Sequence, residues 1–440
     1  MKANHKDKSL AKKVLLSVVA AGVMSGFVLT AEAADIFHED GQKHTYTAVD
    51  AGKVTAYKGS EIELSGGTIT SIKEAHVDPE DDRVGYADVS AESGGAGSKI
   101  VANNADFKGE VHASTGGTII LNGGSVTSGT FYDKDGNSIE DYPTEIGSRG
   151  EGAYVELNKV KIDSNLGAFE GAELTVNDSN VNADTAIYAE GGTINLISTD
   201  GNAKYNVGFV GVKAVEGGVI NIKGGGTLHT TNISVEDDNS SFVTDGSVEA
   251  KKIEAISNAS VILTGGGKIT GAELSTGTKV AALVMDNSTL TATNVDFTGD
   301  FKAEGGSKIT LKGGSVTASD YYDKDGKKDG YTEFGAIGAN SSIEADGVDI
   351  KSATLATDGA KVNIKNSSID TVEGIWAWGK GSEIVLDGTA ANVYTVGESI
   401  VANDGGKIYI NGGTLKDNNL WSKMFGIEAD GETINTDAKG

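Results

Sequence analysis

Two short acidic turns have the clearest potential for ligand chemistry in this sequence. The tetrapeptide Asp-Lys-Asp-Gly occurs at 133–136 and again at 323–326, each time shortly after a Gly-Gly-Ser-Val-Thr run. In the first copy, oxygen-bearing side chains alternate beside a glycine, as in half of a calcium-binding EF-hand loop. The candidate calcium ligands are Asp133, Asp135, Asn137 and Asp141.

The same residues also suit an ordinary turn, because Asp-Gly is a favoured turn pair and Asp accepts hydrogen bonds from its own backbone. An EF-hand loop ends with a bidentate Glu, whereas the first copy has Thr144 at that position. The second copy carries Lys327 and Lys328 where further ligands would be needed. We therefore expect a turn in both copies, with calcium as the alternative and no other cofactor.

Aromatic side chains that could stack on sugar rings form a second candidate set. Trp376 and Trp378 alternate with Ile375 and Ala377, so a strand would turn both tryptophans towards solvent. The alternative is that these rings pack under a neighbouring loop. The candidate ligand-binding residues are Trp376, Trp378, Tyr188, Tyr132, Tyr321 and Tyr322.

The sequence contains little that indicates a catalytic site. The six histidines are scattered without the HExxH spacing of a zinc protease, and no GxSxG segment supplies a nucleophile. Acidic pairs such as Asp81-Asp82 and Glu140-Asp141 are expected by chance in a chain with 63 acidic residues. The chain is predicted not to be an enzyme, and a polysaccharide-acting β-helix is the alternative.

A short repeat predicts the elements that position these residues. Gly-Gly, a spacer and an apolar-x-apolar burst recur, and each burst has the period of a strand bounded by glycine turns. Leu174 and Ile194 are 20 residues apart, and Ile343 and Val362 are 19 apart. A unit of about 20 residues with two or three strands is one coil of a parallel β-helix. The predicted fold is all-β, a right-handed single-stranded parallel β-helix of about 16 to 18 coils.

The coils form a single predicted domain, 56–440, preceded by an N-terminal cap at 34–55. Residues 98–228 and 288–415 are two copies of one block. An antiparallel array of hairpins or a propeller is the alternative fold, but the signatures of propeller blades are absent.

Three polar, tyrosine-containing stretches interrupt the coils, at 71–93, 128–148 and 318–339. Each follows a Gly-Gly-Thr-Ile-Thr or Gly-Gly-Ser-Val-Thr run. They are predicted to be loops that project from one corner of the solenoid, where binding surfaces of such folds are found.

The first 33 residues have the features of a secretory signal peptide. Lysines precede an apolar run from Val14 to Leu29, and Ala31-Glu32-Ala33 is a small-x-small cleavage pattern. The alternative is a membrane anchor, for which the run is short. The net charge of −26 makes nucleic acid an unsuitable partner, and the absence of cysteine excludes disulfides.

An export signal, no cysteine and Gly-Gly-bounded coils in an acidic chain resemble the passenger domains of classical bacterial autotransporters. The similarity is to the pertactin-like and AIDA-like adhesin group and covers most of 34–440. It implies a β-helix at the cell surface or outer membrane, or released outside the cell, acting as an adhesin or autoaggregation factor.

The implied partners are glycans or proteins of host or bacterial surfaces, a second copy of the chain, and an outer-membrane β-barrel translocator. The C-terminal segment ends in Thr-Ile-Asn-Thr-Asp-Ala-Lys-Gly without the long amphipathic strands of such a barrel. A translocator is therefore expected in cis on a longer chain or in trans. A passive surface stalk is a further alternative.

Overall fold

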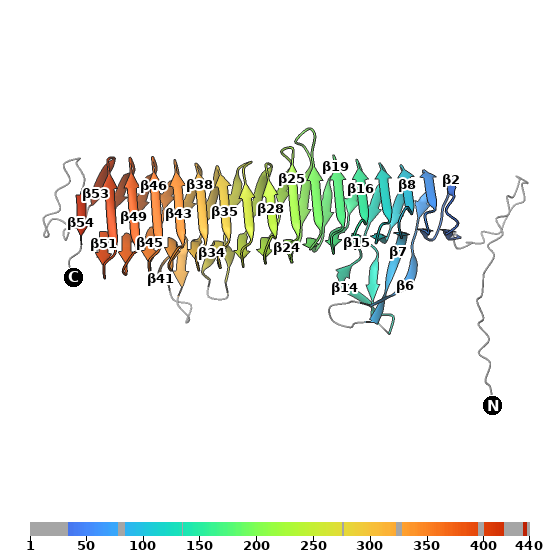
Figure 1. The fold of residues 1–440 in the computed structure, drawn as a ribbon, viewed down its shortest axis with the longest axis horizontal. Helices are drawn as coiled ribbons and strands as arrows, with labels where there is room; N and C mark the ends of the chain where they lie inside the picture. Colours follow the sequence, from blue (N-terminus) through green and yellow to red (C-terminus); the bar gives the residue numbers. More distant parts are fainter. Residues whose placement is uncertain are drawn as a thin grey trace, which may run out of the picture. The chain divides into compact units, whose positions relative to one another are not determined.

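The computed structural model describes residues 34–77, 84–133, 135–274, 277–322, 328–394, 400–417 and 434–437. These residues form a parallel β-solenoid of about 17 turns, built from three stacked sheets (Figure 1). The predicted β-helix and its coil number are confirmed. The described part contains no helix of the length and apolarity needed to cross a membrane. The predicted signal peptide, 1–33, lies outside the described residues.

From β3 onwards the coils run through the three sheets in the order A, B, C, while the first coil contributes β1 to sheet A and β2 to sheet B. The strands of sheet A, in stacking order, are β1 (Ile36–His38), β3 (Val54–Tyr57), β7 (Val84–Gly94), β10 (Glu110–Ser114), β15 (Glu145–Arg149), β18 (Asn165–Phe169), β21 (Ala186–Glu190), β24 (Gly211–Val215), β27 (Asn232–Glu236), β30 (Lys252–Ile256), β34 (Lys279–Val284), β37 (Asp300–Glu304), β42 (Glu333–Ile337), β45 (Ala353–Thr357), β48 (Ile375–Trp378) and β51 (Ile400–Asn403).

Sheet B lies next to sheet A along the chain in every coil. Its strands are β2 (Lys43–Thr47), β4 (Glu61–Ser65), β8 (Lys99–Asn103), β11 (Thr118–Asn122), β16 (Tyr154–Asn158), β19 (Glu173–Asn177), β22 (Thr193–Ile197), β25 (Val219–Lys223), β28 (Ser241–Thr244), β31 (Ser260–Leu263), β35 (Thr289–Thr293), β38 (Lys308–Lys312), β43 (Ser342–Asp346), β46 (Lys361–Lys365), β49 (Glu383–Asp387) and β52 (Lys407–Asn411), followed by β54 (Ile434–Asp437) antiparallel to β52.

Sheet C has 15 short strands. They are β5 (Thr68–Ile69), β9 (Asp106–Lys108), β12 (Ser125–Thr127), β17 (Lys161–Asp163), β20 (Val181–Ala183), β23 (Lys204–Val207), β26 (Thr227–His229), β29 (Ser247–Ala250), β32 (Gly267–Ile269), β36 (Val295–Thr298), β39 (Ser315–Thr317), β44 (Asp349–Lys351), β47 (Ser368–Thr371), β50 (Ala390–Val393) and β53 (Thr414–Asp417).

The register between coils follows the apolar spacing that the sequence predicts. Leu174 pairs with Ile194, and Ile343 pairs with Val362. All four side chains are buried, because alternate residues of each strand point into the space between the three sheets. The inward side chains of successive coils therefore stack into one continuous apolar core.

Asparagine side chains at the ends of the sheet B strands form a second ladder. The side-chain amide of Asn122 donates to Asn103 at 3.0 Å, Asn158 donates to Asn122 at 2.9 Å, and Asn177 donates to Asn158 at 2.8 Å. Each amide thus bonds to the coil before it, so the polar corner follows the same register as the core.

The three interruptions form strands rather than irregular loops, which corrects the prediction. Residues 71–93 contain β6 (Ile72–Val77), antiparallel to β7. Residues 128–148 contain the antiparallel pair β13 (Thr130–Tyr132) and β14 (Ser138–Pro143). Residues 318–339 contain the pair β40 (Asp320–Tyr322) and β41 (Lys328–Tyr331). Polar residues and tyrosines suit such two-sided hairpins, which the turn-rich composition concealed.

All of these hairpins leave the solenoid at one corner, as predicted. Each follows a sheet C strand and leads into a sheet A strand, and the short strand β33 (Ala272–Glu273) does the same before β34. In Figure 1, β6, β14 and β41 project from the same side of the solenoid.

The prediction that 34–55 forms a cap remains a prediction. The described residues show that β1 and β2 pair in parallel with β3 and β4 and thus continue sheets A and B by one coil.

Candidate functional site

The first two hairpins join into one antiparallel sheet. Strand β7 pairs with β6 on one side and with β13 on the other, where Phe131 lies opposite Ala87 and Tyr132 opposite Tyr86. The order β6-β7-β13-β14 defines a four-stranded extension, which unites segments from two successive interruptions of the coil. Strand β7 runs from this extension into sheet A, where its last residues pair with β3 and β10.

A buried lysine attaches the extension to the first coils. Lys53, only 4% exposed, pairs through its Nζ with Glu74 of β6 at 2.5 Å and with Glu92 of β7 at 2.6 Å. Tyr57 donates its hydroxyl proton to the Glu92 carboxylate. Burial opposes ionisation of Glu92, but the hydrogen bonds from Lys53 and Tyr57 outweigh it and lower the pKa of Glu92.

Two partly exposed glutamates face outwards beside this ion-pair cluster. Val111 of β10 pairs with Ile146 of β15, which places Glu110 and Glu145 side by side at the starts of the two strands. Burial and the charge of Glu145 raise the pKa of Glu110 to about 8. Burial also raises the pKa of Glu145 to about 7, against the opposing effect of Arg149. The two carboxyl groups therefore retain protons near neutral pH.

Two glycines give the Glu145 side chain its room. A Cβ at Gly147 would lie 3.1 Å from Oε1 of Glu145, and a Cβ at Gly167 would lie 2.8 Å from its Oε2. Both glycines belong to the outward column of sheet A that continues from His112 to Tyr188. The Glu145 carboxylate therefore lies over the backbone of these two glycines, between His112 and Tyr188 of the same column.

Tyr188 contacts Phe169 and Glu190 on the outer face of sheet A. Its ring centroid lies 5.7 Å from that of Phe169, whose ring is also 4.4 Å from the guanidinium carbon of Arg149. The Tyr188 hydroxyl donates to Glu190 at 3.0 Å. Tyr188 thus stands on the outer face, half-buried, within a small aromatic and charged cluster.

The two tryptophans of β48 point outwards, as predicted. Ile375 and Ala377 are buried, Trp376 is half-buried, and Trp378 is 54% exposed. The indole N–H of Trp378 donates to the Asp404 carboxylate at 2.7 Å, which orients the ring on the surface. Trp376 occupies the same outward column of sheet A as Tyr188, followed strand by strand from β21 to β48.

The remaining predicted tyrosines lie in the hairpins. Tyr132 belongs to β13, and Nζ of Lys73 lies 3.5 Å from the centroid of its ring in a cation–π contact. The Tyr132 hydroxyl is 3.4 Å from the Asp88 carboxylate. The backbones of Tyr321 and Tyr322 lie in β40, while their side chains fall outside the described residues.

The first Asp-Lys-Asp-Gly segment is a turn closed by its own first residue. The Asp133 carboxylate accepts the backbone N–H of Asp135 at 2.9 Å and that of Asn137 at 2.8 Å. It also accepts the side-chain amide of Asn137 at 2.9 Å, and these bonds lower the pKa of Asp133. The side chain of Asp141 and the second copy, 323–326, lie outside the described residues.

This geometry predicts the behaviour of an Asp133→Ala variant. The amide protons of Asp135 and Asn137 should exchange with solvent faster than in the wild type, because both lose their acceptor. The rates, measured by hydrogen exchange, should be the same with calcium and with a chelator. Calcium-dependent protection of these amides in the wild type would instead support the metal hypothesis.

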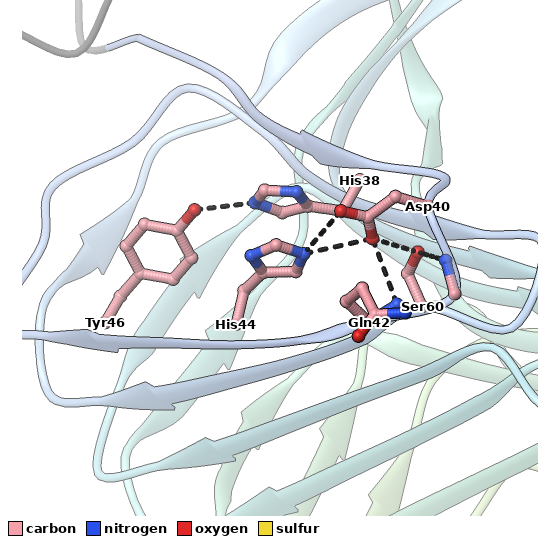
Figure 2. Close-up of polar contacts among 7 residues, drawn as sticks. His38, Asp40, Gln42, His44, Tyr46 and Ser60 are labelled. Carbon is pink, nitrogen blue, oxygen red and sulfur yellow. Dashed lines mark hydrogen bonds and ion pairs between the residues drawn. The ribbon is translucent and has the colours of Figure 1, made fainter.

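A group that sequence inspection did not identify lies in the first coil. His38, Asp40 and His44 bring three potential metal-binding atoms within 4.8 Å of one another. Figure 2 shows the two imidazoles stacked beside the Asp40 carboxylate, with Tyr46 at the far end of the His38 ring. The search for the HExxH spacing of zinc proteases does not detect this group. The pattern that indicates it is His-x-Asp-x3-His, which places three possible metal ligands within seven residues.

The glutamate pair was also missed, since Glu110 and Glu145 are 35 residues apart and a hairpin separates them. Only an alignment of consecutive coils across that insertion would bring them together.

No protein-family model matches this sequence, and no curated protein matches it.

Proposed function

We propose that this chain is an exported β-solenoid of the autotransporter passenger type, which adheres to glycans or proteins on host or neighbouring bacterial surfaces. Its binding surface is the outer face of sheet A together with the hairpins beside it. The resemblance of the sequence to pertactin-like and AIDA-like passengers and the parallel β-solenoid both support this proposal.

One observation carries the proposal: the features suited to recognition gather along a single sheet. Trp376 and Tyr188 share one outward column of sheet A. The four-stranded extension and the β40–β41 hairpin emerge from the edge of that same sheet. A rigid rod with aromatic side chains and hairpins on one side can bind several copies of a surface ligand at once, so weak contacts add in avidity.

The test compares aromatic residues on two sheets. Purified wild-type chain and Trp376→Ala/Trp378→Ala are screened on glycan arrays and on intact cells, and the affinity for each hit is measured. We expect the double variant to lose at least ~10-fold in affinity, because aromatic anchors dominate interface energies.

The matched control is Tyr154→Ala, a half-buried outward tyrosine of sheet B, which should bind like the wild type. A second variant replaces 320–331 with two glycines and tests the hairpin. If folded wild-type chain binds no glycan, protein or cell, the passive stalk is the better description. If Tyr154→Ala loses as much affinity as the tryptophan variant, sheet A is not the binding face.

The glutamate pair favours a second candidate, a polysaccharide-acting enzyme. Glu110 and Glu145 stand side by side with raised pKa values next to aromatic rings, and glycoside hydrolysis uses two carboxyl groups of which one is protonated. Release of reducing ends from a polysaccharide, abolished by Glu145→Gln, would establish this function in place of adhesion. Binding without turnover would reject it.

A further inference from the structure

In the first coil, two histidines and a tyrosine occupy positions that hold apolar core residues in the next coil. His38 pairs with Ala56, His44 with Ile62, and Tyr46 with Leu64. Ala56, Ile62 and Leu64 are buried in the next coil. The three polar rings thus occupy inward columns at the end of the stack, where the apolar core meets the first turn of the chain.

The two imidazoles and a carboxylate converge there. The His38 and His44 rings are stacked with centroids 3.5 Å apart and planes inclined by 9°. Nε2 of His44 lies 3.0 and 3.1 Å from the two carboxylate oxygens of Asp40 (Figure 2). His38 ends β1, Asp40 lies in the turn that follows and His44 belongs to β2, so all three side chains come from the short segment 38–44.

Hydrogen bonds outside this trio hold its members in place. Nε2 of His38 is 2.6 Å from the hydroxyl of Tyr46, which leaves Nδ1 as the nitrogen of His38 that can bind an ion. Asp40 accepts the backbone N–H of Gln42 at 3.0 Å and the hydroxyl of Ser60 at 3.2 Å. Partners of this kind orient the ligands of metal sites by fixing the imidazole tautomer and the carboxylate position.

We propose that His38, Asp40 and His44 bind one divalent transition-metal ion, of which Zn²⁺ is the best fit, and that the ion closes the first coil of the solenoid. Two imidazoles and one carboxylate are typical ligands of Zn²⁺, while calcium and magnesium prefer oxygen alone. Water completes the tetrahedral set.

Binding requires a small rearrangement of side chains. Zinc–ligand bonds of ~2.1 Å bring donor atoms to roughly 3.4 Å from one another, so the stacked rings must turn apart and the Asp40–His44 hydrogen bond must give way to two metal bonds. Both rings are at the end of the core and partly exposed, so no neighbouring coil has to move. The bound ion would tie β1 to β2 across the end of the core.

The experiment titrates Zn²⁺ alone into the full chain, purified without a histidine tag and stripped of metal. Calorimetry should show one ion per chain. Asp40→Asn and His44→Asn should each weaken binding by at least ~10-fold, and Tyr46→Phe should weaken it less, as expected for an orienting partner. Co²⁺ bound in place of Zn²⁺ should give the visible absorption of a four-coordinate site, lost in His44→Asn.

His229→Asn is the matched control. His229 forms an exposed pair with Glu249 on sheet C, its Nδ1 2.9 Å from the carboxylate, without a third ligand among the described residues. Its loss should leave Zn²⁺ binding unchanged. Thermal melts in chelator check that each variant folds. The proposal is overturned if folded wild-type chain fails to bind Zn²⁺ at millimolar concentration, or if Asp40→Asn and His44→Asn bind as the wild type does.

Discussion

Gly314→Ala is expected to destabilise the solenoid by at least ~4 kcal/mol, near the upper end of single-residue effects. Gly314 is the second glycine of a Gly-Gly-Ser-Val-Thr run and has a φ of +77°. A Cβ at this position would lie 2.2 Å from the carbonyl oxygen of Val295 in the preceding coil. The left-handed backbone alone costs an alanine ~1 kcal/mol or more, and the contact with main-chain atoms cannot be relieved by rotating a side chain.

The control is Gly171→Ala. Gly171 also has a positive φ, +80°, but a Cβ added there would have no atom within 4 Å. This variant should lose only ~1 kcal/mol. Urea denaturation followed by circular dichroism gives both values. Equal losses for the two variants would show that backbone strain, rather than the close approach of consecutive coils, explains the recurring Gly-Gly pair.

Glu110→Gln is expected to stabilise the protein above pH 8 and to have little effect at pH 5. The pKa of Glu110 in the folded chain is about 8, above its ordinary value. Surrounding protein atoms reduce the solvation of the carboxylate, and the charge of Glu145 repels it. Between the two pKa values the folded chain binds a proton that the unfolded chain has released, so stability falls as pH rises. Glutamine removes this loss.

The expected gain in the free energy of unfolding at pH 9 is ~2 kcal/mol. Counting the whole pKa shift at ~1.4 kcal/mol per unit would give a larger gain, which is reduced here because the side chain is partly exposed to solvent. Urea midpoints of wild type and variant at pH 5 and pH 9 measure it. Glu344→Gln, at an exposed carboxylate of sheet B paired with Lys308, is the matched control for the loss of one negative charge. A Glu110→Gln variant that is no more stable than the wild type at pH 9 would contradict the raised pKa.

Local pattern in the chain was enough to predict the solenoid, its coil length and the outward direction of Trp376 and Trp378. Each of these depends on neighbours in sequence: glycines end the strands, and alternation within a strand decides which side chain is buried. Residues one coil apart then meet automatically, as Leu174 and Ile194 do, because identical coils stack in register.

Contacts that cross an insertion or close an end could not be predicted in this way. Strands β7 and β13 meet because two interruptions leave the same corner of the solenoid two turns apart, and no periodicity specifies that pairing. Glu110 meets Glu145 because β10 and β15 stack in consecutive coils, but the hairpin inserted between them hides this spacing in the sequence. His38 and His44 adopt inward positions only because β1 and β2 stack on β3 and β4, so their approach is a property of the folded first coil.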